Sequence, residues 1–210
     1  MHKISRSCLV TGARGLIGTQ VLKIIRDECR IFAVSRRQPE MRDRNIKFIK
    51  LNLSRKWNAS VLPRKIDTVI YLAQSEHFRD FPNHGPDIFN VNTLSVLKFL
   101  EYARKARAKT FILASSGGVE RLDSGRNSEM ENGLRFYLST KLCSEVLARQ
   151  YARFFNVIIL RFFFVYGQGQ RKDMFIPGLI SRVKEKRPIV LDGHDGIKVN
   201  PMHVSDAAYA

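Results

Sequence analysis

Two residues four positions apart, Tyr137 and Lys141, have the types and the spacing of an acid/base pair. On a helix, residues i and i+4 lie one above the other, so the lysine ammonium would sit near the tyrosine hydroxyl. A neighbouring positive charge favours the phenolate and would lower the tyrosine pKa from about 10 toward the working range of a general base. The spacing alone is weakly specific, because both residue types are common on solvated helix faces.

A glycine-rich segment near the amino terminus, residues 11–18 (TGARGLIG), spaces its glycines as GxxGxxG between an expected strand and an expected helix. In such a turn, the positive end of a helix and its N–H groups can receive a pyrophosphate. We expect Gly12 to permit the turn, Gly15 to let the backbone approach the ligand, and Gly18 to allow close helix–strand packing. The segment predicts a dinucleotide site, and a glycine-rich turn without a ligand is the alternative.

The end of the second expected strand carries Ser35, Arg36 and Arg37. At this position a carboxylate would hold the ribose 2′-hydroxyl of NAD, whereas an arginine accommodates the 2′-phosphate of NADP. Guanidinium groups make charge-assisted bonds to phosphate, so the pattern favours NADP over NAD. The alternative is that one or both arginines belong to a general basic surface.

The elements that must position these residues alternate between strand and helix. We expect strands near residues 8–10, 30–35, 46–51, 68–73, 110–116 and 156–161, and helices near 16–28, 87–108 and 137–154. A polar loop is expected before the last helix, with Gly125, Asn127, Asn132 and Gly133. This order predicts an α/β fold, a doubly wound parallel sheet of the Rossmann type. Ligands bind beyond the carboxyl ends of such strands, where the candidate residues collect.

Composition limits the class of protein. The chain has 210 residues, 44% apolar and 26% charged, and no apolar run approaches the roughly 20 residues that span a bilayer. It starts without the long apolar core of a secretory signal, so we expect a cytoplasmic protein that does not contact membranes. The three cysteines and five histidines are scattered, so we expect neither a disulfide framework nor a metal site.

The chain is strongly basic, with 36 Lys and Arg against 19 Asp and Glu and a net charge of +17. Such a charge attracts nucleotides, nucleic acid or acidic surfaces. Between residues 36 and 65 the only acids are Glu40 and Asp43. The basic residues of that stretch are Arg36, Arg37, Arg42, Arg44, Lys47, Lys50, Arg55, Lys56, Arg64 and Lys65. A solvated basic surface is the alternative for most of them.

Four motifs, TGARGLIG, ILASS, YLSTK and LRFFFVYGQGQ, occur in an order that resembles the extended short-chain dehydrogenase/reductase family, the NAD(P)-dependent sugar epimerase/dehydratase group. The resemblance covers nearly the whole chain, and the four motifs together are highly specific. It implies an NAD(P)-dependent epimerase or reductase that acts by hydride transfer on a nucleotide sugar or a related hydroxyl or carbonyl compound.

The resemblance also implies roles for individual residues. Ser116 matches the serine that hydrogen bonds the reacting oxygen, Tyr137 matches the acid/base tyrosine, and Lys141 matches the lysine that binds the nicotinamide ribose. Asn92 matches an asparagine on the helix behind the active site. The remaining cofactor positions that it implies are Gly12, Arg14, Gly15, Leu16, Ile17, Gly18, Arg36, Arg37, Asn52, Leu53, Leu72, Ala73, Gln74 and Phe164.

Departures from the family pattern narrow the reaction and leave the substrate open. Sugar 4,6-dehydratases carry an Asp-Glu pair after the catalytic hydroxyl residue, where this chain has Gly117 and Gly118. Dehydration is therefore disfavoured. Phe164 stands in place of the usual asparagine before Val-Tyr-Gly, which removes a polar substrate contact.

The last segment, residues 200–206, resembles a late motif after which family members normally continue, whereas this chain stops at Ala210. We expect a dinucleotide-binding domain at 1–167 and a partial substrate lobe at 168–210, from a truncated or a shortened member. The resemblance implies a homodimer through helices 87–108 and 137–154. Two alternatives stay open: a non-catalytic NADP-binding or RNA-binding relative, although nucleic acid is the less favoured partner, and an inactive fragment.

Overall fold

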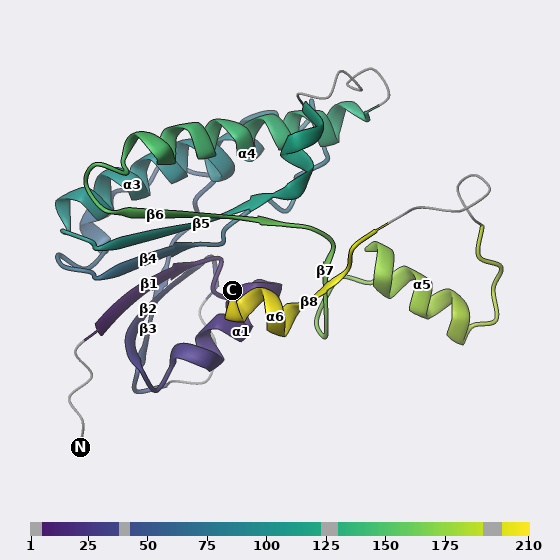
Figure 1. Ribbon diagram of the computed structural model, residues 1–210, viewed down its shortest axis with the longest axis horizontal. Helices are drawn as coiled ribbons and strands as arrows, with labels where there is room; N and C mark the ends of the chain where they lie inside the picture. Colours follow the sequence, from purple (N-terminus) through teal and green to yellow (C-terminus); the bar gives the residue numbers. More distant parts are fainter. Residues whose placement is uncertain (1–5, 38–42, 123–129, 191–198) are drawn as a thin grey trace.

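A computed structural model describes residues 6–37, 43–122, 130–190 and 199–210. Its centre is a parallel six-stranded sheet in the order β3-β2-β1-β4-β5-β6 (Figure 1). The strands are β1 (Arg6–Thr11), β2 (Cys29–Ser35), β3 (Ile46–Lys50), β4 (Thr68–Tyr71), β5 (Thr110–Ser116) and β6 (Asn156–Phe162). The order reverses between β1 and β4, which makes their carboxyl ends the switch point of a doubly wound sheet. The predicted fold class is confirmed.

Helices cover both faces of the sheet (Figure 1). The described helices are α1 (Leu16–Ile25), α2 (Gly85–Phe89), α3 (Ser95–Lys105), α4 (Asn132–Gln150), α5 (Phe175–Lys184) and α6 (Val204–Tyr209). Shorter turns are η1 (Ala59–Val61), η2 (Asn90–Leu94) and η3 (Gly117–Leu122), and two short strands, β7 (Val165–Tyr166) and β8 (Met202–His203), pair with each other. Helices α3 and α4 lie over one face, and α1 lies over the other with α6 beside it.

Two hydrophobic cores lie on opposite faces of the sheet because neighbouring strand residues point in opposite directions. Leu9 of β1 joins the core under α3, which includes the fully buried Phe99 and Phe111. Val10 joins the second core, under α1, with Val21. Burying each such side chain contributes about 1.5–3 kcal/mol. Burial on both faces explains why the strand sequences are continuously apolar.

Two predicted boundaries differ from the structure. The helix expected at 87–108 begins at Gly85, ends at Lys105 and contains the π-helical turn η2. Asn132 and Gly133, expected in a loop, open α4 instead, while Gly125 and Asn127 lie outside the described residues. A Cβ atom on Gly133 would lie 2.0 Å from the carbonyl oxygen of Arg79. This glycine is therefore required for close packing on α4 and does not mark a turn.

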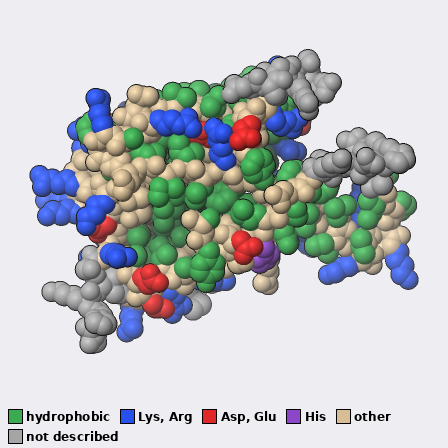
Figure 2. Space-filling view, in the orientation of Figure 1, with side chains coloured by type: hydrophobic (Ala, Val, Ile, Leu, Met, Phe, Trp, Pro, Cys, Tyr) green, Lys and Arg blue, Asp and Glu red, His purple; other side chains and the backbone are tan. Residues whose placement is uncertain are grey.

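The segment after β6 reaches away from the sheet and then returns (Figure 1). Helix α5 has no buried residue, and its Val183 side chain is 63% exposed. Figure 2 shows hydrophobic side chains on the surface of this region. Helix α6, in the second of the two regions expected from the sequence, packs on α1 of the first. None of the described helices combines the length and apolarity needed to cross a membrane.

Candidate active site

The glycine-rich loop folds tightly between β1 and α1. Gly12 has a φ of +64°, a conformation that favours glycine, and a Cβ atom there would lie 2.8 Å from the carbonyl carbon of Leu72. Gly15 N–H donates to the Gly12 carbonyl at 2.8 Å, and a Cβ on Gly18 would lie 2.2 Å from the same oxygen. No side chain caps α1, so its first N–H groups are left for an anion. The loop fits a dinucleotide pyrophosphate.

Thr11 opens the predicted glycine-rich segment, but no role of its own was predicted for it from the sequence. Its Oγ1 accepts hydrogen bonds from the backbone N–H groups of Leu72 at 3.1 Å and Ala73 at 3.2 Å, and the residue is completely buried. These bonds join the carboxyl ends of β1 and β4 at the switch point. The only sequence signal was its place between a strand and the glycine loop.

Ser116 of β5, Tyr137 of α4 and Gln74 of the segment after β4 come together in the fold. The Tyr137 hydroxyl donates to Gln74 Oε1 at 2.9 Å, and Ser116 Oγ accepts from the N–H of Gly118 at 3.2 Å. Burial raises the pKa of Tyr137 to about 12, while a hydrogen bond with Ser116 and the charge of Arg79 act in the opposite direction. The predicted serine and tyrosine are neighbours at the carboxyl edge of the sheet.

Lys141 does not act on Tyr137 as the spacing predicted. Its Nζ donates to the carbonyl oxygen of Ala114 at 2.9 Å and lies 5.9 Å from the centre of the Tyr137 ring. Burial lowers the lysine pKa to about 8, although the charge of Glu145 opposes this. The expected fall in the tyrosine pKa is wrong for this structure, because burial outweighs the attraction between two groups that point to different partners.

Glu145, one further turn along α4, anchors that helix to the sheet. Its side chain is fully buried and accepts hydrogen bonds from Ser115 Oγ at 2.6 Å, from Arg161 Nε and Nη2 at 2.9 and 2.8 Å, and from Arg149 at 3.0 Å. Burial alone would raise the carboxyl pKa, but these hydrogen bonds hold it below its usual value. In the sequence, the only indication of this role was that Glu145 follows Lys141 by four residues.

Asn92 lies in the π-helical turn η2 and is 1% exposed. Its Oδ1 accepts from the N–H of Ser75 at 3.1 Å, and its Nδ2 donates to Thr140 Oγ1 at 3.1 Å. Through these two bonds the Asn92 amide connects η2 to the segment after β4 and to α4. Asn92 was expected behind the site and in contact with the cofactor, and its bonds within the protein suit a positioning residue rather than one that touches a ligand.

At the end of β2, Arg36 forms a two-point ion pair with Glu76, which follows β4. One of these contacts, Nη2 to Oε2, measures 2.9 Å. The hydrogen bond from Arg36 lowers the pKa of Glu76. Arg37 is exposed next to this pair. The guanidinium of Arg36 is thus already paired with a carboxylate that the sequence did not place beside it.

The other predicted cofactor residues differ in how far they are exposed. Asn52 Oδ1 accepts hydrogen bonds from the N–H and the hydroxyl of Ser54 at 3.1 and 2.9 Å, so it shapes its own turn. Leu53 is 7% exposed and belongs to the core under α3. Arg14 is exposed on the glycine loop, and Leu16 and Ile17 are half-buried at the start of α1.

Aromatic side chains occupy the corner next to Ser116. A Cβ atom on Gly117 would lie 2.0 Å from the ring of Phe163, so no other residue fits there without displacing that ring. Phe164 has a φ of +31°, and its ring lies 6.1 Å from that of Phe175. The ring of Phe163 thus lies where the resemblance places the first of the two dehydratase carboxylates.

Two histidines that look scattered in the sequence meet in the loop after β4. Ligand atoms of His77, Asp80 and His84 lie within 4.8 Å of one another. The imidazole rings are stacked at 3.8 Å with planes 8° apart. Parallel planes keep the in-plane lone pairs of the two rings from converging on one point, so these residues would have to rearrange to hold a metal ion.

The doubly wound sheet and its glycine loop define a Rossmann-type dinucleotide-binding protein. The sequence model of the NAD dependent epimerase/dehydratase family matches residues 8–210, and the chain belongs to this family. Its members are enzymes of the extended short-chain dehydrogenase/reductase type, as the motifs predicted.

Known relatives agree with this assignment. The Bacillus subtilis protein described as an uncharacterized UDP-glucose epimerase, YtcB, is 29% identical over 94% of this chain and 69% of its own length. MoeE5, solved in complex with UDP-glucuronic acid and NAD, is 30% identical with a TM-score of 0.77, over 97% of this chain and 70% of that one. The Bacillus cereus UDP-glucuronic acid 4-epimerase, at 23% identity and a TM-score of 0.78, shares the fold over 96% of this chain and 70% of its own.

Proposed function

We propose that this protein is an NAD(P)-dependent epimerase or reductase that acts on a nucleotide sugar. The observation that carries the proposal is the meeting of Ser116 with Tyr137 at the edge of the sheet where the glycine loop lies. Family membership supports a nicotinamide cofactor. The names of two relatives, which refer to UDP-glucose and UDP-glucuronic acid, support a nucleotide-sugar substrate.

In this proposal Tyr137 first loses its proton to water when a dinucleotide with a positively charged nicotinamide is bound, and the phenolate then takes the proton from the reacting hydroxyl and returns it, while Ser116 donates a hydrogen bond to the developing oxyanion. A bound nicotinamide would supply hydride transfer. Lys141, whose pKa is lowered to about 8, can hold or release a proton near neutral pH. Gln74, which accepts from the Tyr137 hydroxyl at 2.9 Å, would release it when a substrate hydroxyl takes its place.

Epimerisation or reduction is favoured over dehydration because of Gly117. Elimination of water needs an additional acid and base near the sugar, and the ring of Phe163 fills the space where a side chain on residue 117 would stand. Dehydratase activity would therefore require both a new carboxylate and displacement of this ring.

For the cofactor we propose NADP, because β2 is followed directly by Arg36 and Arg37 rather than by a carboxylate. The ion pair between Arg36 and Glu76 leaves Arg37 as the main guanidinium for a 2′-phosphate. Two observations favour NAD instead. Glu76 is a carboxylate beside Arg36, and MoeE5 was solved with NAD. Calorimetric titration with both dinucleotides decides the matter, and tighter binding of NAD would overturn the proposal.

We also propose a cytoplasmic homodimer that forms through α2, α3 and α4. Four large apolar side chains of this region, Phe89, Leu94, Val146 and Phe154, are 38–50% exposed. Covering such side chains with a second copy removes apolar surface from water.

The function is tested by incubating the protein with each dinucleotide and a panel of UDP-sugars, and following the sugar by NMR. We expect turnover that Tyr137→Phe abolishes and that Tyr209→Phe, on an exposed tyrosine of α6, leaves unchanged. Turnover that survives Tyr137→Phe would refute the mechanism. Dinucleotide binding without turnover would favour the alternative of a non-catalytic binding protein.

A further inference from the structure

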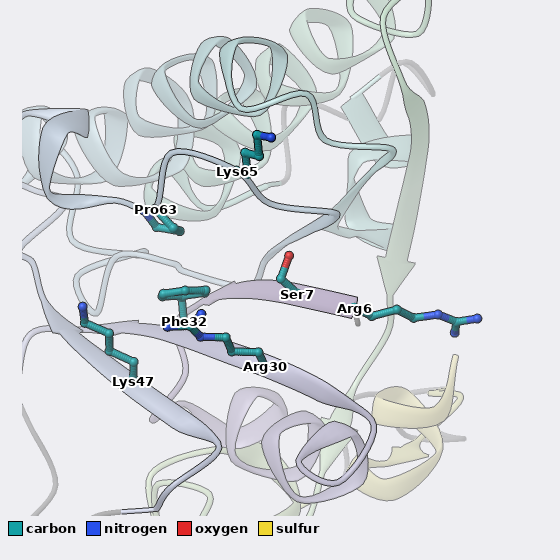
Figure 3. A pocket seen from close by; sticks show the side chains of 7 residues that line it. All are labelled: Arg6, Ser7, Arg30, Phe32, Lys47, Pro63 and Lys65. Carbon is teal, nitrogen blue, oxygen red and sulfur yellow. The ribbon is translucent and has the colours of Figure 1, made fainter. Parts of the chain in front are cut away.

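A hollow lies at the opposite end of the strands from the glycine loop. Its volume is about 460 Å³. It is lined by Arg6, Ser7, Arg30, Phe32, Lys47, Pro63 and Lys65 (Figure 3). β1 begins at Arg6 and reaches the glycine loop after Thr11, so the whole length of the strand separates the two places. The candidate active site does not use any of these side chains.

Sheet register explains why basic side chains gather here. Ser7 of β1 pairs with Arg30 of β2, and Phe32 pairs with Lys47 of β3. Because alternate residues of a strand share a face, Arg30 and Phe32 point the same way, together with Ser7 and Lys47. The sheet therefore presents two cations from adjacent strands on one face at its amino-terminal edge. Figure 2 shows Lys and Arg side chains at this end of the molecule.

The segment before β4 completes the hollow. Leu62 and Ile66 are buried in the core under α3, and the Pro63 carbonyl accepts a hydrogen bond from Tyr102 Oη at 2.8 Å. These anchors fix the chain between them, which places Pro63 and Lys65 along the hollow. Figure 3 shows the Pro63 and Phe32 rings facing each other, with Lys47 and Lys65 from different segments.

Among the residues that the structure describes, no salt bridge neutralises the positive charges of the hollow, which are those of Arg6, Arg30, Lys47 and Lys65. The neighbouring carboxylate of Asp67 accepts from Ser7 at 2.8 and 3.0 Å and pairs with Lys109 at 3.4 Å. Like charges on adjacent strands repel, so this arrangement would gain stability from a bound anion.

We propose that this hollow binds a small ligand with two or more phosphate groups, such as an inorganic or nucleoside polyphosphate. Lysine and arginine make charge-assisted bonds to phosphate, and the volume falls in the range of about 300–1,000 Å³ that is usual for small-molecule sites. Phe32 is only 7% exposed, with the guanidinium of Arg30 5.3 Å from its ring centre. It offers no open face on which successive bases could stack, which favours a compact polyphosphate over single-stranded nucleic acid.

The test is calorimetric titration with tripolyphosphate and with ATP, using the wild type and the double variant Lys47→Glu/Lys65→Glu. We expect binding of one equivalent and a loss of affinity of about tenfold or more in the variant. The milder Lys47→Gln/Lys65→Gln variant should show an intermediate loss. The control is Lys172→Glu/Lys184→Glu, which changes two exposed lysines around α5 by the same charge.

The outcomes separate the possibilities. Equal affinity for both probes supports recognition of polyphosphate alone, and tighter binding of ATP supports a contribution from the nucleoside. Equal weakening in the two double variants would show general charge attraction and overturn the proposal. RNA binding that depends on Lys47 and Lys65, without tripolyphosphate binding, would also overturn it in favour of nucleic acid. The measurement does not depend on turnover, so it stands apart from the proposed enzymatic function.

Discussion

Arg161 of β6 holds both carboxylate oxygens of Glu145 on α4, through Nε at 2.9 Å and Nη2 at 2.8 Å. Glu145 is fully buried and Arg161 is half-buried, and the pair fixes the helix that carries Tyr137 and Lys141 against β6, which pairs with β5, the strand that carries Ser116. The relative position of the three candidate catalytic residues therefore depends on an ion pair behind them.

Replacing one partner of this pair leaves the other charge without its partner. The two single substitutions should therefore cost more stability in sum than the double substitution. We expect Arg161→Leu to destabilise the protein by about 2–3 kcal/mol, because the buried Glu145 loses its two-point partner and keeps only Ser115 and Arg149. The double variant Glu145→Leu/Arg161→Leu should lose less than the sum of the two single variants. Urea unfolding of all four proteins measures the coupling, and additive losses would show that the pair does not couple.

The buried Lys141 should make stability depend on pH. Its folded pKa, lowered to about 8, lies below the usual value of 10.5. Between these values the unfolded chain keeps the proton that the folded protein has released, so stability rises with pH. Relative to Lys141→Met, we expect the free energy of unfolding to increase by up to about 3 kcal/mol over this window. A pH-independent difference between the two proteins would contradict the assignment.

Tyr137 should not ionise in the free protein at moderate pH, since burial raises its pKa to about 12. The ultraviolet phenolate absorbance of the wild type and of Tyr137→Phe should therefore rise together up to about pH 10. Bound oxidised dinucleotide adds a positive charge, which favours the phenolate, and should produce a wild-type signal at lower pH. An early signal without dinucleotide would mean that Lys141 lowers the pKa unaided.

Phe164 adopts a left-handed backbone, with a φ of +31°, although its side chain is 44% exposed. Asparagine tolerates this conformation better, so Phe164→Asn should raise the free energy of unfolding by about 1 kcal/mol. The matched control is Phe163→Asn, whose backbone does not have a positive φ and whose ring packs on Gly117. This control should destabilise the protein, and stabilisation by both variants would point to a cause other than backbone strain.

The proposed dimer predicts a charge-sensitive surface on α4. Val146 is 50% exposed there, and Val146→Glu should convert a dimer to a monomer by placing a charge in an apolar contact. Val183→Glu changes a 63% exposed valine on α5 and should leave the mass unchanged. Light scattering during gel filtration measures both, and a monomeric wild type would refute the dimer.

The sequence by itself was enough to predict the sheet, the glycine loop and the family. These features depend on local patterns, namely continuous apolar strands, glycine spacing, and motifs in a set order. Gly12 illustrates this, because its need for a positive φ follows from the turn that it makes.

Tertiary structure decided which partners the chemical groups have. Lys141 donates to Ala114, Arg36 pairs with Glu76, and the ring of Phe163 occupies the space beside Gly117. Each contact joins residues far apart in the chain, and no local periodicity records such a pairing. The predicted effect of Lys141 on Tyr137 failed for this reason: helical spacing brings two residues to one face, but burial and the nearest acceptor determine where a charge lies and what its pKa becomes.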